Sequence, residues 1–212
     1  MVQPTELTLE VATQQGTAQV VMQAPRAPSA VLLIGHGAGG GIDAPDILAV
    51  RDAALGLGVA VGRVLQPYRV RGSRAPAPAP RLDEAWVSVS RAVSARRALR
   101  GLPIVHAGRS SGARVACRCA DELDAAAVVA LAFPVHPPGK PEKSRLSELT
   151  AVTAPVLVVQ GERDPFGCPP PSALRPPSHL VVIPGADHAL KRDPVRVGLA
   201  VAEFLIDRGW SR

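Results

Sequence analysis

The chain has 212 residues, a length that fits one domain built around one core. Hydrophobic residues make up 47% and aromatic residues 3%, so Ala, Val, Leu and Ile must fill the interior, and a disordered chain is excluded. The formal net charge of +6 would suit a nucleic-acid partner, but the arginines are scattered along the chain rather than clustered. We therefore expect no nucleic-acid partner.

The cysteines and the first residues indicate a compartment. Cys117 and Cys119 form a C-x-C inside a predicted helix, which is neither a redox pair nor a zinc motif, and Cys168 leaves an odd number. Unreactive thiols are typical of a reducing compartment. The chain opens without a basic, apolar and small-residue leader, and no apolar run reaches the roughly 18 residues of a membrane span. We expect a soluble cytoplasmic protein with no membrane partner.

The predicted elements begin with a hairpin and then alternate between strands and helices. Residues 6–12 and 17–23 are rich in Val and Thr around Gln14-Gln15-Gly16, a pattern that predicts two antiparallel strands. Residues 30–34, "AVLLI", form a continuous apolar run before the loop "GHGAGGG", as in a strand covered on both faces. The remaining predicted strands are 59–65, 103–107, 127–132, 155–160 and 179–183, and the predicted helices are 44–57, 82–99, 111–123 and 194–206.

This alternation predicts an α/β fold, a mostly parallel sheet flanked by helices on both faces, with residues 1–212 in one domain. Two Pro-rich segments interrupt it, 67–80 ("PYRVRGSRAPAPAP") and 133–145 ("FPVHPPGKPEKSR"). The Ala-Pro alternation of the first predicts extended polyproline geometry. Both segments follow strands, and ligands of open α/β sheets bind outside the carboxyl ends of strands. We predict that these two loops form walls of a site.

A candidate nucleophile lies in the segment "GRSSG", which matches G-x-S-x-G with Ser110 in the middle. The apolar segment "LPIVHA" precedes it and the predicted helix "SGARVACRCA" follows it. Such a sharp strand-to-helix turn exposes a serine Oγ, and the start of a helix favours negative charge beside it. A plain structural turn would explain the glycines equally well.

A serine nucleophile needs a base, and the base needs an acid that orients it. Asp164 in "GERDPFG" and His188 in "GADHAL" each follow a predicted strand, which gives the chain order Ser, Asp, His at one edge of the sheet. Asp164 could instead start a turn, His188 could cap the last helix, and Asp187 could be the acid. We favour Asp164, because a residue adjacent to His188 would usually point away from the imidazole.

The same chemistry needs two backbone amides that face the carbonyl oxygen as it gains charge. Ser111 directly follows the nucleophile and is predicted to give one amide. The second is expected from the glycine-rich loop, with Ala38 first and Gly39 second. A phosphate cradle is the alternative for this loop, but it lacks G-K-[ST], and no acidic residue ends the next strand as in a dinucleotide site.

Cationic residues in the loops near this edge are candidates for substrate binding. They would suit an anionic or carboxylate-bearing ester. The alternative is that they are solvated surface charges or bind loop carbonyls, and long cationic side chains on loops are usually exposed. The candidate substrate-binding residues are Gly39, Arg69, Arg71, Arg74, His136 and Lys140.

The motifs together resemble a known family. "GHGAGGG", "GRSSGARVA", "GERDPFG" and "GADHALK" are similar to α/β-hydrolases, near the dienelactone hydrolase-like proteins, over nearly the whole chain. "PYRVRGSRAP" and, more specifically, "HPPGKPEK" resemble a small hydrolase-like family that includes the testis-expressed protein and a subunit of a chromatin acetylation complex. The resemblance implies a triad of Ser110, Asp164 and His188 and neither metal nor organic cofactor. Dienelactone hydrolases proper use a cysteine nucleophile, so their substrate class does not follow for Ser110.

The sequence thus predicts a serine hydrolase that cleaves a small ester or thioester, with no large cap domain and a shallow, open pocket. The alternative is a non-catalytic module of the same fold that binds another protein, as the relative from the chromatin complex suggests. The expected partners are a small-molecule ester substrate and, for assembly, a second copy of the chain in a homodimer. Neither hypothesis requires a cofactor.

Overall fold

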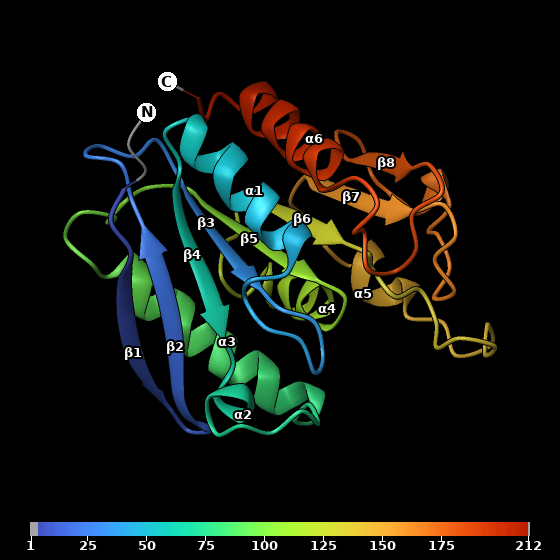
Figure 1. Ribbon diagram of the computed structural model, residues 1–212, viewed down its shortest axis with the longest axis horizontal. Coiled ribbons are helices and arrows are strands. Elements are labelled where there is room, and N and C mark those ends of the chain that lie inside the picture. Colours follow the sequence, from blue (N-terminus) through green and yellow to red (C-terminus); the bar gives the residue numbers. More distant parts are fainter. Residues whose placement is uncertain (1–3, 212) are drawn as a thin grey trace.

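The computed structural model describes residues 4–211, which form an eight-stranded sheet with helices on both faces (Figure 1). The strand order is β1-β2-β4-β3-β5-β6-β7-β8, in which β1 and β2 form a hairpin, β2 is antiparallel to β4, and all later neighbours are parallel. The predicted hairpin and mostly parallel sheet are confirmed. The strands are β1 Leu7–Thr13, β2 Gly16–Gln23, β3 Val31–Gly35, β4 Ala60–Leu65, β5 Ile104–Arg109, β6 Ala127–Leu131, β7 Val156–Gly161 and β8 His179–Ile183.

Two layers of helices cover the sheet. Helices α1 (Pro45–Gly56) and α6 (Pro194–Asp207) pack together on one face, and α3 (Ala79–Ser94) and α4 (Ser111–Cys119) lie on the other (Figure 1). Side chains of β3 alternate between the two faces, since Leu32 packs in the α1/α6 core and Leu33 in the α3 core. Burial on both faces explains why this strand is apolar throughout.

The first Pro-rich segment is helical at both ends, so the extended geometry predicted from its Ala-Pro alternation is wrong for Ala79 and Pro80. Pro67–Val70 form the short helix α2, and α3 already begins at Ala79 rather than at residue 82. Proline is favourable in the first turn of a helix, because the amide that it lacks would have no acceptor there. Helix α3 also ends at Ser94, five residues before the predicted end.

Short helices were harder to predict than long ones. Helix α4 ends at Cys119, four residues early, and neither α5 (Leu146–Thr150) nor the 3₁₀ turn Pro171–Ala173 was expected. One helical turn shows no apolar period, and in α5 only Leu149 is buried. Residues 132–145, between β6 and α5, contain no helix or strand, so no cap domain is inserted there. None of the helices within residues 4–211 combines the length and hydropathy that a membrane span requires.

Candidate active site

Three predicted site residues meet at the carboxyl edge of the sheet. Ser110 follows β5, Asp164 follows β7 and His188 follows β8. His188 Nε2 lies 2.8 Å from Ser110 Oγ, and His188 Nδ1 lies 2.8 Å from Asp164 Oδ2. With Nδ1–H donating to the carboxylate, Nε2 is free to accept the proton of the serine hydroxyl.

The alternative acid, Asp187, is turned away from this cluster. Its exposed side chain accepts a hydrogen bond from the Ala189 backbone N–H at 2.9 Å. The His188 imidazole contacts Asp164 instead, as expected from the adjacency of Asp187 and His188 in the chain.

Ser110 has a strained backbone at the sharp turn from β5 to α4. Its φ of 53° and ψ of −109° lie in a region that non-glycine residues rarely adopt. The flanking glycines allow the strand and helix to approach closely, since a Cβ on Gly108 would lie 2.1 Å from the carbonyl carbon of Gly112. A Cβ on Gly112 would in turn lie 2.5 Å from the Gly35 oxygen. The segment therefore holds Ser110 in a strained conformation, which a plain structural turn would not require.

The Asp164 carboxylate is fully buried and held by two further donors. Gln160 Nε2 donates to Oδ2 at 2.7 Å, and the Phe166 backbone N–H donates to Oδ1 at 2.9 Å. These bonds fix the orientation of the oxygen that contacts His188. The sequence contained a signal for Gln160, a polar residue that ends the apolar run "APVLVVQ", but its role was not predicted.

Phe166 also stacks on the His188 ring. The ring centroids are 4.1 Å apart and the planes differ by 29°. The phenyl ring covers one side of the imidazole and lines the cavity next to Ser110. No sequence motif indicated this contact, because it depends on how two separate loops pack.

The residues that carry the two predicted amides lie beside Ser110. Ser111 is the first residue of α4, so its N–H has no acceptor within the helix. Ala38 lies in a turn closed by the bond from Gly40 N–H to Gly37 O at 3.1 Å, and both Ala38 and Ser111 line the cavity at Ser110. The Gly39 amide instead lies beside the Tyr68 hydroxyl. Burial raises the pKa of Tyr68, and the charge of Arg69 and the hydrogen bond from Gly39 partly offset this increase.

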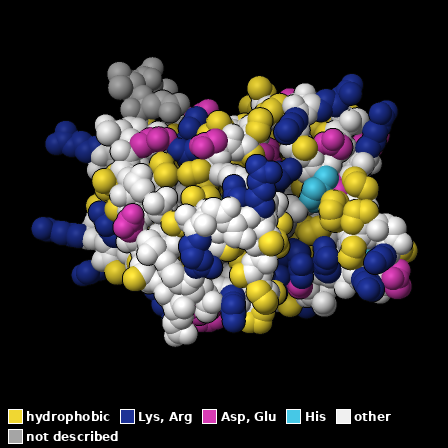
Figure 2. All heavy atoms as spheres, turned by 60° about the horizontal axis from the view of Figure 1, so that its bottom comes forward, with side chains coloured by type: hydrophobic (Ala, Val, Ile, Leu, Met, Phe, Trp, Pro, Cys, Tyr) yellow, Lys and Arg dark blue, Asp and Glu magenta, His cyan; other side chains and the backbone are white. Residues whose placement is uncertain are grey.

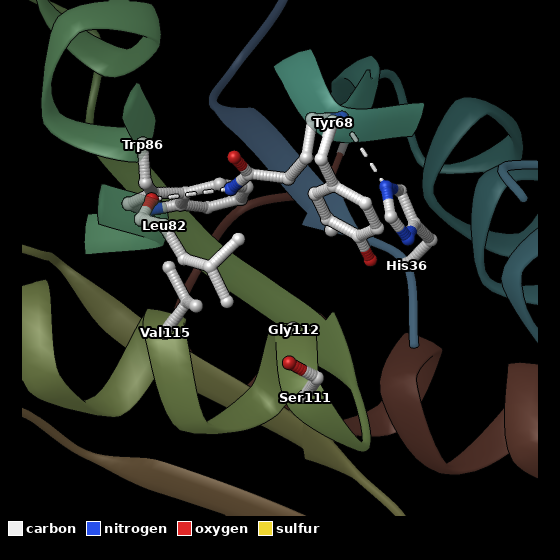
Figure 3. A pocket seen from close by; sticks show the side chains of 9 residues that line it. His36, Tyr68, Leu82, Trp86, Ser111, Gly112 and Val115 are labelled. Atoms are coloured by element: carbon white, nitrogen blue, oxygen red, sulfur yellow. Dashed lines mark hydrogen bonds between the residues drawn. The ribbon is translucent and has the colours of Figure 1, made fainter. Parts of the chain in front are cut away.

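A small internal cavity of about 10 Å³ lies behind Ser111, close to the volume that one water requires. Figure 3 shows His36 and Tyr68 on one side of it and Trp86, Leu82 and Val115 on the other. His36 Nδ1 donates to Gly37 O at 2.8 Å, and Nε2 accepts from the Gln66 N–H at 3.2 Å. Burial lowers the pKa of His36, in the direction that favours the neutral ring this pair of bonds requires. His36 therefore anchors the loop that carries Ala38.

Arg109, the residue before Ser110, joins several segments of the site. Its Nε lies 3.0 Å from Oδ2 of Asp46 in the first turn of α1, and its Nη2 donates to the His188 backbone oxygen at 3.2 Å. A Cβ on Gly37 would lie 2.9 Å from Arg109 Nη1, so the guanidinium packs directly against this loop. Asp46 is fully buried, and burial raises its pKa whereas the charge of Arg109 lowers it. Neither Arg109 nor Asp46 was predicted. The G-x-S-x-G pattern accepts any residue at the position of Arg109, and no motif includes Asp46.

The cavity at Ser110 has a volume of about 360 Å³ and opens to solvent. Both Pro-rich loops contribute walls, as predicted, with Pro76 from the first and Pro134 and Arg145 from the second. Figure 2 shows Lys and Arg side chains gathered near a histidine and a group of hydrophobic side chains on the forward face. The full lining consists of Ala38, Pro76, Arg109, Ser110, Ser111, Arg114, Pro134, Arg145, Phe166 and His188.

The predicted cationic residues lie elsewhere. Arg69 Nη1 donates to the Ser73 backbone oxygen at 3.0 Å, and Arg71 Nη1 donates to the Gln15 backbone oxygen. Both thus bind loop carbonyls, which was the alternative to substrate binding. The arginines that line the cavity are Arg109, Arg114 and Arg145, none of which was predicted from the sequence.

The second Pro-rich loop shows the same pattern. His136 Nδ1 lies 2.9 Å from the Pro137 oxygen, and Lys140 is exposed with its backbone N–H bonded to the same oxygen. Neither His136 nor Lys140 lines the cavity at Ser110, and neither does Gly39 or the exposed Arg74.

With this fold and site established, comparison with known proteins places the chain in a family. Residues 28–205 match the family model described as the alpha/beta hydrolase domain. The chain therefore belongs to the α/β-hydrolase family. No curated protein matches the sequence.

Solved structures with this fold include several hydrolases. The α/β serine hydrolase without a lid from Xanthomonas campestris is 22% identical with a TM-score of 0.76, over 97% of this chain and 95% of the other. Dienelactone hydrolase from Anabaena variabilis is 20% identical with a TM-score of 0.78, over 100% of both chains. Est1E from Butyrivibrio proteoclasticus is 18% identical with a TM-score of 0.76, over 95% and 98%. At these identities the similarity shows that the chain shares the fold of these proteins.

Proposed function

We propose that the protein is a serine hydrolase that cleaves a small ester or thioester by acyl transfer to water. The observation that carries this proposal is the continuous chain of contacts from Ser110 Oγ through His188 to Asp164, with both separations at 2.8 Å. A strained serine at the start of a helix, an oriented imidazole and a buried carboxylate are the arrangement that activates a hydroxyl for nucleophilic attack.

The reaction proceeds in two halves. Ser110 Oγ attacks the carbonyl carbon while His188 Nε2 takes its proton, and Asp164 stabilises the imidazolium that forms. The amides of Ser111 and Ala38 stabilise the oxyanion of the tetrahedral intermediate. His188 then gives its proton to the leaving alcohol or thiol, which departs and leaves an acyl-serine. A water, deprotonated by the same imidazole, releases the acid and restores the serine hydroxyl.

The cavity supports a small substrate. Its walls come from short loops without a cap, and the relatives of like fold are described as a serine hydrolase without a lid and a dienelactone hydrolase. The proposal includes membership of the narrower hydrolase-like family that the segment "HPPGKPEK" resembles. That resemblance does not identify a substrate. The placement of residues 1–212 in one cytoplasmic domain that needs no cofactor is part of the same proposal.

The test combines ester hydrolysis with covalent labelling. Wild type should hydrolyse 4-nitrophenyl acetate or butyrate and should be labelled by a fluorophosphonate, and Ser110→Ala should lose both. Ser147→Ala, a change of the same type on the exposed side of α5, should keep both. A correctly folded wild type that takes up no label would contradict the proposal and favour the protein-binding module.

A further inference from the structure

We propose that the cavity at Ser110 selects an ester that carries one carboxylate, and that Arg145, assisted by Arg114, binds this carboxylate. The inference rests on the proposed hydrolase function and adds to it a substrate class and two specificity-determining residues. It follows from the charges around the cavity, from the position of the two arginines and from the apolar side chains that line the same cavity.

The charges near Arg145 are not balanced. Arg114 binds Glu148 through two bonds, Nε to Oε2 at 2.8 Å and Nη2 to Oε1 at 2.5 Å. Arg118 binds Asp83 through two bonds of 2.8 and 2.6 Å and shares Glu148 at 3.1 Å. Within residues 4–211, the Arg145 side chain makes no hydrogen bond or ion pair, so three guanidinium groups face two carboxylates.

Arg145 is partly buried next to a second cation. Burial and the charge of Arg114 both lower the pKa of Arg145, and the charge of Glu148 opposes them. Two neighbouring cations with one uncompensated charge are unfavourable in a partly desolvated place. A bound monoanion would remove this excess, and a carboxylate matches the planar geometry of a guanidinium.

Both arginines are fixed with respect to the nucleophile. Arg114 lies one turn into α4, and its backbone N–H donates to the Ser110 oxygen at 3.2 Å. The Arg145 backbone N–H donates to Val135 O at 2.7 Å, next to the wall residue Pro134. Arg114 and Arg145 line the same cavity as Ser110 and His188, so a ligand in this cavity can meet both groups.

The cavity also has apolar walls. Pro76, Pro134 and Phe166 line the cavity together with the arginines, and no Asp or Glu belongs to this part of the described lining. A short hydrocarbon segment suits these walls, with the scissile carbonyl at Ser110 and the carboxylate at Arg145. Such a ligand is a half-ester of a dicarboxylic acid or an ester of a hydroxy acid.

Two matched substrate pairs test the inference and locate the charge. Mono-4-nitrophenyl adipate and its neutral methyl ester differ only in a carboxylate on the acyl side. The pair 4-acetoxybenzoate and 4-acetoxybenzamide places the same difference on the leaving group. In wild type, kcat/KM for the acid of at least one pair should exceed that of its neutral partner by about tenfold or more, as expected for a charge-assisted hydrogen bond.

The variants separate Arg145 from the general charge of the protein. In Arg145→Gln the acid-to-neutral ratio should fall close to one, and Arg145→Lys should keep part of it because the charge remains. Arg97→Gln makes the same charge change at an exposed position before β5, at the opposite edge of the sheet, and should keep the wild-type ratio. Circular dichroism of each variant verifies folding.

The failures are distinguishable. Hydrolysis of all four esters with ratios near one in wild type would overturn the carboxylate site and leave the hydrolase proposal intact. A preference that persists in Arg145→Gln would overturn the assignment to Arg145. Absence of both hydrolysis and fluorophosphonate labelling in folded wild type would contradict the proposed function itself.

Discussion

The strand β5 carries two contrasting regions within five residues. His106 lies in its middle, is fully buried and accepts a hydrogen bond from Trp86 Nε1 at Nδ1, at 2.9 Å. Ser110 lies just beyond its end and contacts His188, whose side chain is 19% exposed. The difference is that the His188 imidazole has a carboxylate on one nitrogen, a hydroxyl on the other and access to the cavity, which are the features that the proposed chemistry requires.

Burial without an acid makes His106 inert. Its Nε2 has no hydrogen-bond partner in the described structure, and burial lowers its pKa to about 4. The ring therefore stays neutral at physiological pH and serves as a packing residue with one polar contact. His188 differs because the Asp164 carboxylate is positioned to stabilise the charged ring.

The largest expected effect on activity comes from removing the Asp164 carboxylate, which leaves His188 without an acid, as His106 is. Asp164→Asn should lower kcat/KM by roughly 10³-fold or more, because an amide can stabilise the wrong tautomer and cannot stabilise the imidazolium. Ester hydrolysis measured at constant pH checks this. Asp187→Asn is the matched control and should keep wild-type kcat/KM. A large loss in Asp187→Asn together with near wild-type activity in Asp164→Asn would identify Asp187 as the acid instead.

Arg109 lies between the two regions, and its buried partner gives the second prediction. Asp46→Asn should lower the free energy of unfolding by about 3 kcal/mol, because the Arg109 guanidinium would lose its counter-ion in a partly buried place. It should also reduce kcat through the bond from Arg109 to the His188 backbone. Urea unfolding and ester hydrolysis measure the two effects. Unchanged values of both would show that Asp46 is dispensable.

The sequence predicted the parts of this comparison that depend on chain order. Ser110, Asp164 and His188 each follow an apolar strand, so parallel strand order alone brings them to one edge of the sheet. Gln160, Phe166 and the pairing of Arg109 with Asp46 were not predictable, since they depend on side-chain packing between separate loops. The helix starts within the first Pro-rich segment were missed because Ala-Pro repeats suit both extended chain and a first helical turn.

The arginines show the same limit. Those in conspicuous loops, such as Arg69, bind nearby backbone oxygens, whereas Arg114 lies within a helix and Arg145 at the end of a loop. Charge alone does not reveal which guanidinium already has a partner. That information comes only from the fold.

The smallest expected effect sharpens the contrast through pH. Because the pKa of His106 is about 4 in the folded protein and about 6.5 when unfolded, the unfolded state binds more protons between these values. The contribution of His106 to stability is therefore complete above pH 6.5 and is lost as the pH falls toward 4. The free energy of unfolding should be roughly 2 to 3 kcal/mol lower at pH 4.5 than at pH 7.5 from this residue.

His106→Gln isolates this contribution. The glutamine oxygen can still accept from Trp86 Nε1, but the side chain does not titrate. The variant should therefore lose less stability than wild type between pH 7.5 and 4.5, although its stability at neutral pH is lower. Carboxylates and the buried His36 titrate in both proteins, so the difference between the two pH profiles belongs to residue 106. An equal loss in both proteins would mean that His106 gains protons as readily in the fold as in the unfolded chain, and its contrast with His188 would then not rest on burial.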